Sequence, residues 1–232
     1  LASGLMIIAI GREFTRRIAE FSKLDKEYIA EATLGKISTT YDAEGKITPF
    51  CHSGFLVRHP ELDSGSPAWK HEIPGPWPGR QARNDETVEP NRDEINKTLQ
   101  SFIGEQNQMP PIYSAKKIKG QKAYDLARQG KKVELKPVSV NISEIKLLNY
   151  QYPILKFSTN VSSGTYIRSL IHDIGQKLGT GAYMSELVRT AIGDYKLEQA
   201  IDLDEIKSTA DLHPHQLPLN KGESRGGIIK LR

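Results

Sequence analysis

The 232-residue sequence contains a single cysteine and no long apolar run, and each shortage excludes a class of protein. The single cysteine, Cys51, cannot form a disulfide within the chain and fits a reducing compartment. The longest apolar run, Leu5–Ile10, is far shorter than the roughly 20 residues of a membrane-spanning helix. A signal-peptide pattern is also lacking. We therefore predict a cytoplasmic protein that makes no membrane contact.

The residues that are present give the composition of a globular protein, with 38% hydrophobic and 26% charged residues and a net charge of +4. Residues 50–90 differ from the rest, since they hold both tryptophans and six of the thirteen prolines and show no periodicity. We expect an inserted flexible surface loop there. Outside this insert the net charge rises to +6, which weakly favours a nucleic-acid partner.

Periodicity outside the insert predicts a mixture of strands and helices. Strands are expected at residues 5–10, 28–34, 138–148 and 154–161, with a frayed strand at 226–229. Helices are expected at residues 12–24, 95–103, 123–129, 165–178 and 184–190. Gly179 stands where the left-handed residue that ends a helix belongs.

The segment Gly164–Leu170 (GTYIRSL) is a candidate functional site at the start of a predicted helix. Backbone N–H groups at a helix start suit an anion. Arg168 lies in the first turn, close to the apolar stripe, and a cation at the edge of a core needs an acidic partner. The alternative is that Arg168 is a structural cation on a solvated face.

The segment Met109–Lys117 (MPPIYSAKK) combines an aromatic residue with a run of basic residues on a loop. Two prolines favour an extended entry before Tyr113. Lys116 and Lys117 suit contact with phosphates, and the tyrosine suits stacking on RNA bases. The alternative is a solvated basic loop. The histidines near Cys51 lack a recognised zinc spacing, so we predict no metal site.

Four ordered segments together resemble the TruB-type tRNA pseudouridine synthases, the family that modifies uridine 55 in the T-loop. LASGLMIIAIGREFTR is similar to the end of the family's catalytic motif, Gly-x-Leu-Asp-Pro-(Leu)-Ala-(Ser/Thr)-Gly-(Val/Leu)-Leu. YIAEATLGKISTTYDAEG is similar to the strand and turn that follow. MPPIYSAKKIKGQKAYDLARQG matches the signature PPxYSAxKxxGxxxYxxAR, and SSGTYIRSLIHDIGQKLGTGAYMSELVRT matches the final motif.

The resemblance implies an α+β fold with a mixed, mainly antiparallel central sheet flanked by helices and an RNA cleft across it. It implies a reaction in which an aspartate attacks a flipped-out uridine, with no cofactor, and a monomer that binds the T-arm of tRNA. The implied catalytic residues are Tyr28, Asp42 and Arg168. The implied RNA-binding residues are Tyr113, Lys116, Lys117, Tyr166 and Leu187.

The beginning of the chain departs from this pattern, because the family's aspartate would stand two residues before Leu1. We expect a catalytic domain over residues 1–212 that lacks its N-terminal part, and a tail at 213–232 too short for a complete PUA RNA-binding module. We hypothesise that the chain as written is inactive without that aspartate. The alternative function is a non-catalytic RNA-binding or tRNA-folding remnant.

Overall fold

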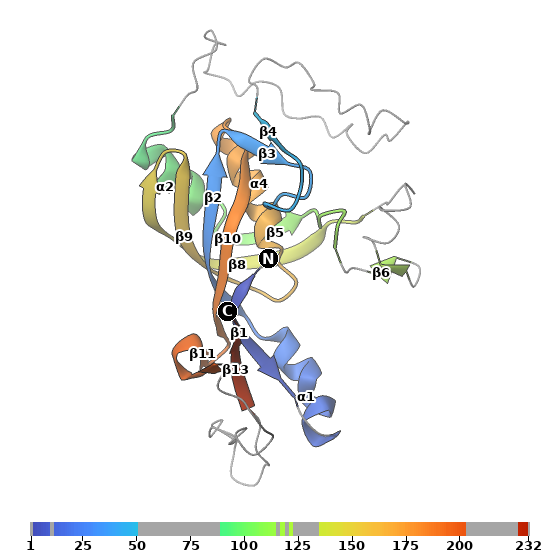
Figure 1. Ribbon diagram of the computed structural model, residues 1–232. Helices are drawn as coiled ribbons and strands as arrows, with labels where there is room; N and C mark the ends of the chain where they lie inside the picture. Colours follow the sequence, from blue (N-terminus) through green and yellow to red (C-terminus); the bar gives the residue numbers. More distant parts are fainter. Residues whose placement is uncertain are drawn as a thin grey trace.

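The computed structural model describes residues 2–9, 12–50, 89–114, 117–118, 121–122, 135–202 and 227–231 (Figure 1). The helices are α1 (Arg12–Lys23), α2 (Arg92–Gln100) and α4 (Ile167–Leu178), with a short 3-10 helix at Leu197–Gln199. The longer strands are β1 (Ser3–Ile8), β2 (Lys26–Leu34), β5 (Gly104–Gln108), β8 (Val138–Gln151), β9 (Ile154–Val161), β10 (Ala182–Ile192) and β13 (Gly227–Leu231). The shorter strands are β3 (Lys36–Ser38), β4 (Ile47–Pro49), β6 (Lys117–Ile118), β7 (Gln121–Lys122), β11 (Tyr195–Lys196) and β12 (Ile201–Asp202).

A mixed sheet of nine strands runs through the molecule in the order β12-β13-β1-β10-β2-β9-β8-β5, with β11 paired to β10. Two pairs are parallel, β1 with β10 and β12 with β13, and the other pairs are antiparallel. The remaining strands form two hairpins, β3-β4 and β6-β7. The predicted α+β class with a mixed, mainly antiparallel sheet is therefore confirmed.

Helices α2 and α4 cover one face of this sheet, and the main core lies between the two layers. Strands β2 and β9 alternate regularly between buried and half-buried residues, so each sends every second side chain into this core. Figure 1 shows α1 beside β1 and β13, at the opposite end of the sheet from α2. The fully buried side chains include Leu34, Ile95, Leu99, Leu155, Phe157, Leu170, Ile171 and Ile174.

The predicted helix at residues 184–190 is wrong, because these residues lie in the middle of β10. This strand pairs with β2 on one side and β1 on the other, so it is a central strand of the sheet. Its pairing with β2 shifts register between Met184 and Glu186 and again between Arg189 and Ala191. At each shift the alternation between the two faces of the sheet is interrupted. The two-residue period of apolar residues is therefore too irregular to be recognised in the sequence.

The other predicted elements agree with the structure to within a few residues. Helix α2 ends at Gln100, earlier than predicted, and α4 begins at Ile167 rather than Thr165. Gly179 caps α4 with a φ of 73°, as predicted. The predicted helix at 123–129 and nearly all of the predicted insert at 50–90 lie outside the described residues. Among the described residues, no helix is long and apolar enough to cross a membrane.

Candidate functional site

The centre of the candidate site is an ion pair between Arg168 in the first turn of α4 and Asp42 in the turn after β3. The Arg168 Nη1 atom donates to Asp42 Oδ2 at 2.7 Å. The Asp42 side chain is 6% exposed and the Arg168 side chain is 21% exposed. The acidic partner that the position of Arg168 requires is therefore Asp42, and one part of the guanidinium group still faces solvent.

The carboxylate of Asp42 is held by its own turn as well as by the arginine. The Thr40 hydroxyl donates to Oδ1 at 2.5 Å, and the backbone N–H of Glu44 donates to the same oxygen at 3.1 Å. Asp42 also forms a single parallel bridge with Met184 of β10. The turn, the sheet and α4 thus all fix the position of this one carboxylate.

These contacts determine the charge of Asp42. Burial alone would raise the pKa of this carboxyl group. The hydrogen bonds from Thr40, Arg168 and the Glu44 backbone, with the positive charge of Arg168, outweigh burial and hold the pKa below its usual 3.8. Asp42 is therefore a carboxylate at neutral pH.

The second donor of Arg168 connects the site to the loop after β5. The Arg168 Nη2 atom donates to the backbone oxygen of Tyr113 at 2.5 Å. The predicted segments Met109–Lys117 and Gly164–Leu170 therefore meet at the guanidinium group. Tyr113 is 40% exposed, and Met109 and Ile112 in the same loop are similarly exposed, at 38% and 42%. This loop therefore presents an apolar surface beside the ion pair.

Gln108 at the end of β5 anchors the start of α4. Its side-chain oxygen accepts from the Tyr166 N–H at 2.8 Å, and its side-chain nitrogen donates to the Tyr166 oxygen at 3.0 Å. Gln108 is only 6% exposed. One of the backbone N–H groups that we expected to suit an anion is therefore already bonded to Gln108. The role of Gln108 was not predicted from the sequence.

Two further predicted residues lie in adjacent strands of the sheet. Tyr28 in β2 is 8% exposed and stands opposite Arg189 of β10 and Thr159 of β9. Leu187 in β10 stands opposite Ala30 of β2 and packs, half-buried, against the main core. Lys116 lies outside the described residues, and only the backbone of Lys117 is described.

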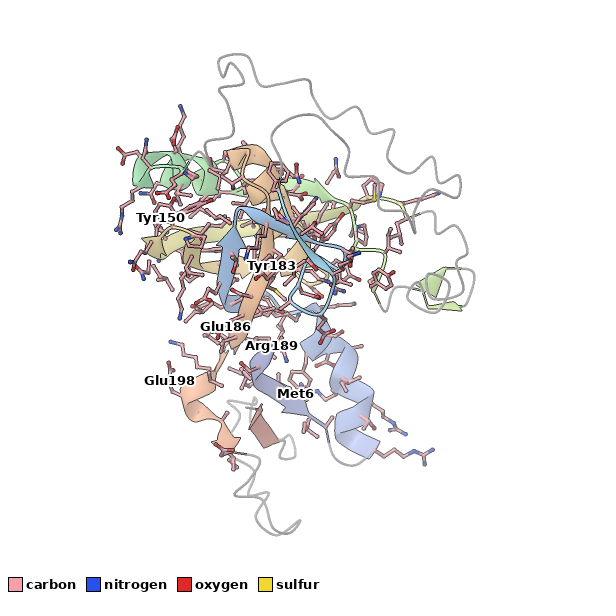
Figure 2. The ribbon with its side chains drawn as sticks, turned by 45° about the horizontal axis from the view of Figure 1, so that its top comes forward. Met6, Tyr150, Tyr183, Glu186, Arg189 and Glu198 are labelled. Carbon is pink, nitrogen blue, oxygen red and sulfur yellow. The ribbon has the colours of Figure 1, made fainter. Side chains whose placement is uncertain are left out.

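Strand β1 has no room for a side chain at Gly4, where it pairs with β10 next to these residues. Gly4 has a φ of 101°, and a Cβ atom added there would lie 2.4 Å from the backbone oxygen of Arg189. The Arg189 Nε atom donates to the Leu5 oxygen at 2.6 Å, and Leu5 is fully buried. Figure 2 shows Arg189 where the main part of the sheet meets β1 and α1. Arg189 was not predicted as a site residue, although it stands two positions after Leu187.

Among the described residues, no group of three or more histidine, cysteine, aspartate or glutamate side chains is placed to hold a metal ion. Cys51 and the nearby histidines at 52, 59 and 71 lie outside those residues. The site described here therefore consists of a buried ion pair, a tyrosine in the sheet and an exposed apolar loop. This arrangement can orient a second acidic group and offer surfaces for stacking.

Comparison with known families gives two matches that together cover most of the chain. Residues 1–60 and 78–167 match the family described as "TruB family pseudouridylate synthase (N terminal domain)". Residues 168–220 match the "tRNA pseudouridylate synthase B C-terminal domain". The first match is interrupted at residues 61–77, within the predicted insert.

Individual relatives agree with these matches. A protein of Bacteroides fragilis named tRNA pseudouridine synthase B is 40% identical over 87% of this chain and 72% of its own length. A protein of Mycoplasma mobile with the same name is 40% identical over 100% of this chain and 71% of its own length. A third, from Protochlamydia amoebophila, is 36% identical over 91% of this chain and 67% of its own length.

A solved structure supports the fold. The chain is similar to one in the crystal structure of a Cbf5-Nop10-Gar1 complex, with a TM-score of 0.51 and 25% identity. The similarity covers 83% of this chain and 38% of that one, so this chain spans well under half of its structural relative. The same arrangement of sheet and helices thus occurs in a longer protein.

Proposed function

Because the chain belongs to the TruB family of pseudouridylate synthases, we propose that it isomerises uridine 55 in the T-loop of tRNA to pseudouridine. The names of the relatives favour tRNA pseudouridine synthase activity over a non-catalytic RNA-binding role. The observation that carries the assignment of the site is the ion pair between Arg168 and Asp42, which joins two of the family's motifs in space.

The proposed role of Arg168 is to orient the nucleophilic aspartate. Arg168 already has a buried partner in Asp42 and a backbone partner in Tyr113, so its guanidinium plane is fixed. Arginine has five N–H donors in a rigid plane, and it can bind a second carboxylate from its exposed side. Asp42 would then act through Arg168, as a positioning residue.

The path of β1 supports this role. Ser3 pairs with Val188 and Gly4 with Arg189 in a parallel register. Because the pairing is parallel, residues that precede Ser3 would run alongside the part of β10 that leads towards Met184, where Asp42 forms its bridge. In the family's motif the aspartate stands two residues before the position of Leu1, so it would approach the exposed side of Arg168.

Tyr28 and Leu187 would form the pocket for the flipped base. They lie on the adjacent strands β2 and β10, close to Val188 of β10, with which Ser3 of β1 pairs. Flipping the uridine out of its stack costs a few kcal/mol, and this cost is offset by the contacts that the pocket makes with the base. A tyrosine ring supplies stacking and a leucine supplies an apolar wall. In the reaction the aspartate attacks the target nucleotide, the bond between N1 of the base and C1′ of the sugar breaks, and the base turns. A bond then forms between C5 and C1′, the C5 hydrogen is released as a proton, and N1 takes up a proton.

The loop that carries Tyr113 would form the wall that contacts the RNA. Its exposed apolar side chains suit stacking on bases of a single-stranded loop, and Lys116 and Lys117 would add phosphate contacts. Tyr166 would support this wall from the start of α4, where Gln108 holds its backbone. The affinity for tRNA should therefore fall steeply with increasing salt.

Release of tritium from C5-labelled uridine in tRNA tests the proposal, using the protein with whatever residues its gene encodes before Leu1. A tRNA in which uridine 55 is replaced by cytidine should release no tritium. Arg168→Lys keeps the charge but loses the planar fork, and we expect the rate to fall at least 100-fold. The matched control is Arg92→Lys at the exposed start of α2, which should keep the full rate. Equal release from both tRNAs would contradict the choice of uridine 55.

A further inference from the structure

Tyr41 and His172 form a stacked pair next to the ion pair of Arg168 and Asp42. Their ring centroids are 4.0 Å apart and the ring planes differ by 18°. Tyr41 precedes Asp42 in the chain, and His172 follows Arg168 by one helical turn on α4. The turn and the helix therefore touch at two consecutive levels, once through the rings and once through the charges.

The backbone of Tyr41 has a conformation that a large side chain rarely adopts. Its φ is 66°, and among the described residues no other non-glycine residue has a positive φ. Such a conformation persists only where surrounding contacts enforce it. The Tyr41 N–H donates to the Ser38 oxygen at 3.1 Å, and its oxygen accepts from the Met184 N–H at 2.9 Å.

Of these three contacts of Tyr41, the stack on His172 is the one made with α4. The hydrogen bonds to Ser38 and Met184 tie Tyr41 to its own turn and to β10. The stack and the Asp42 carboxylate therefore both join this turn to α4. His172 is largely buried, and burial lowers its pKa to about 4, so it is a neutral ring at neutral pH and does not compete with Arg168 for Asp42.

We propose that Tyr41 and His172 are positioning residues, whose stacked rings fix the turn against α4 and so hold Asp42 and Arg168 in the orientation that the reaction needs. This inference rests on the proposed function of Arg168. Neither ring is assigned a contact with the RNA, so their loss should slow the chemical step and leave tRNA affinity unchanged.

Two substitutions at Tyr41 separate positioning from simple structural support. Tyr41→Phe keeps the ring, and its single-turnover rate on tRNA should stay within about twofold of the wild type. Tyr41→Gly removes the ring but readily accepts the positive φ, so the backbone of the turn is relieved rather than strained. We expect its single-turnover rate to fall at least tenfold, with a tRNA dissociation constant within twofold of the wild type.

His172 provides the other side of the test. His172→Phe keeps a flat ring and should keep the rate, whereas His172→Leu should lose as much rate as Tyr41→Gly. Because each single change destroys the same stack, the double variant Tyr41→Gly/His172→Leu should be no slower than either single variant. Additive losses would overturn the proposal, as would a Tyr41→Gly variant that reacts at the wild-type rate.

A readout without activity distinguishes failure of this inference from failure of the proposed function. In 15N NMR spectra the two Nη atoms of Arg168, assigned with the Arg168→Lys variant, should give distinct signals because both are hydrogen-bonded. Tyr41→Gly should merge them, and Tyr41→Phe should not. If the wild type makes no pseudouridine while the signals merge as expected, only the proposed function fails. Distinct signals in Tyr41→Gly would overturn the positioning role.

Discussion

Replacing Gly4 with alanine is expected to separate β1 from β10 and to destabilise the protein more than a comparable change elsewhere. Gly4 has a φ of 101°, and its added Cβ atom would meet the Arg189 oxygen at 2.4 Å and the Arg189 nitrogen at 2.8 Å. Both are backbone atoms of a central strand and cannot rotate away. The strands must therefore move apart where Arg189 donates to the Leu5 oxygen.

The magnitude follows from two contributions. A non-glycine residue in this region of φ costs about 1–3 kcal/mol. Loss of a hydrogen bond from a charged donor to a buried carbonyl adds roughly 1.5–3 kcal/mol. We therefore expect Gly4→Ala to lower the free energy of unfolding by about 2.5–6 kcal/mol. In a protein of this size that corresponds to a fall in Tm of roughly 5–24 °C.

Gly104→Ala is the matched control. Gly104 has a φ of 107°, but no atom lies within 4 Å of an added Cβ, so only the backbone cost applies. We expect that variant to lose about 1–3 kcal/mol. Urea titrations of both variants, followed by circular dichroism, measure the difference. Equal losses would refute the close approach of β1 and β10 as the reason for glycine at position 4.

Three further predictions concern the site and its supports. Asp42→Asn should lower the single-turnover rate about 100-fold at unchanged tRNA affinity, because the amide no longer neutralises Arg168; a wild-type rate would contradict this. Gln108→Leu should cost about 1–3 kcal/mol in urea titrations, since it leaves the Tyr166 N–H unpaired while the Tyr166 oxygen still accepts from the Leu170 N–H, and a loss below about 0.5 kcal/mol would count against the anchor. His172 has a folded pKa of about 4, below its ordinary 6.5, so the unfolded chain takes up the proton first as pH falls. The contribution of His172 to stability should therefore be complete above pH 6.5 and decline by up to about 3 kcal/mol between pH 6.5 and 4. Burial raises the pKa of the adjacent Asp173 to about 6, so that group acts in the opposite direction, and comparison with His172→Phe isolates the part due to His172.

Much of the fold was predictable where the period of apolar residues is uninterrupted. In β9 the side chains of Leu155, Phe157 and Val161 alternate with half-buried neighbours, and the strand was identified from that alternation. In β10 the two register shifts break the period, and the same reasoning gave a helix. Local patterns therefore predict an element only when its pairing is regular.

The ion pair of the site was predictable in part, because an arginine at the edge of a core requires an acid. The resemblance supplied Asp42 as a candidate near Arg168, and the structure pairs the two. The anchor by Gln108 and the stack on His172 were not predictable, because each joins residues that are far apart in sequence and carries no local signal. Only the packing of the turn and β5 against α4 brings those partners together.

The most direct measurement is the position of pseudouridine in tRNA after incubation with the protein as its gene encodes it. Carbodiimide modification followed by primer extension locates each pseudouridine in an unmodified transcript. Membership of the TruB family and the geometry around Arg168 predict a single stop that reports uridine 55, absent with Arg168→Lys and present with Arg92→Lys. A pseudouridine at another position, or one that persists in Arg168→Lys at the wild-type rate, would contradict the proposed site.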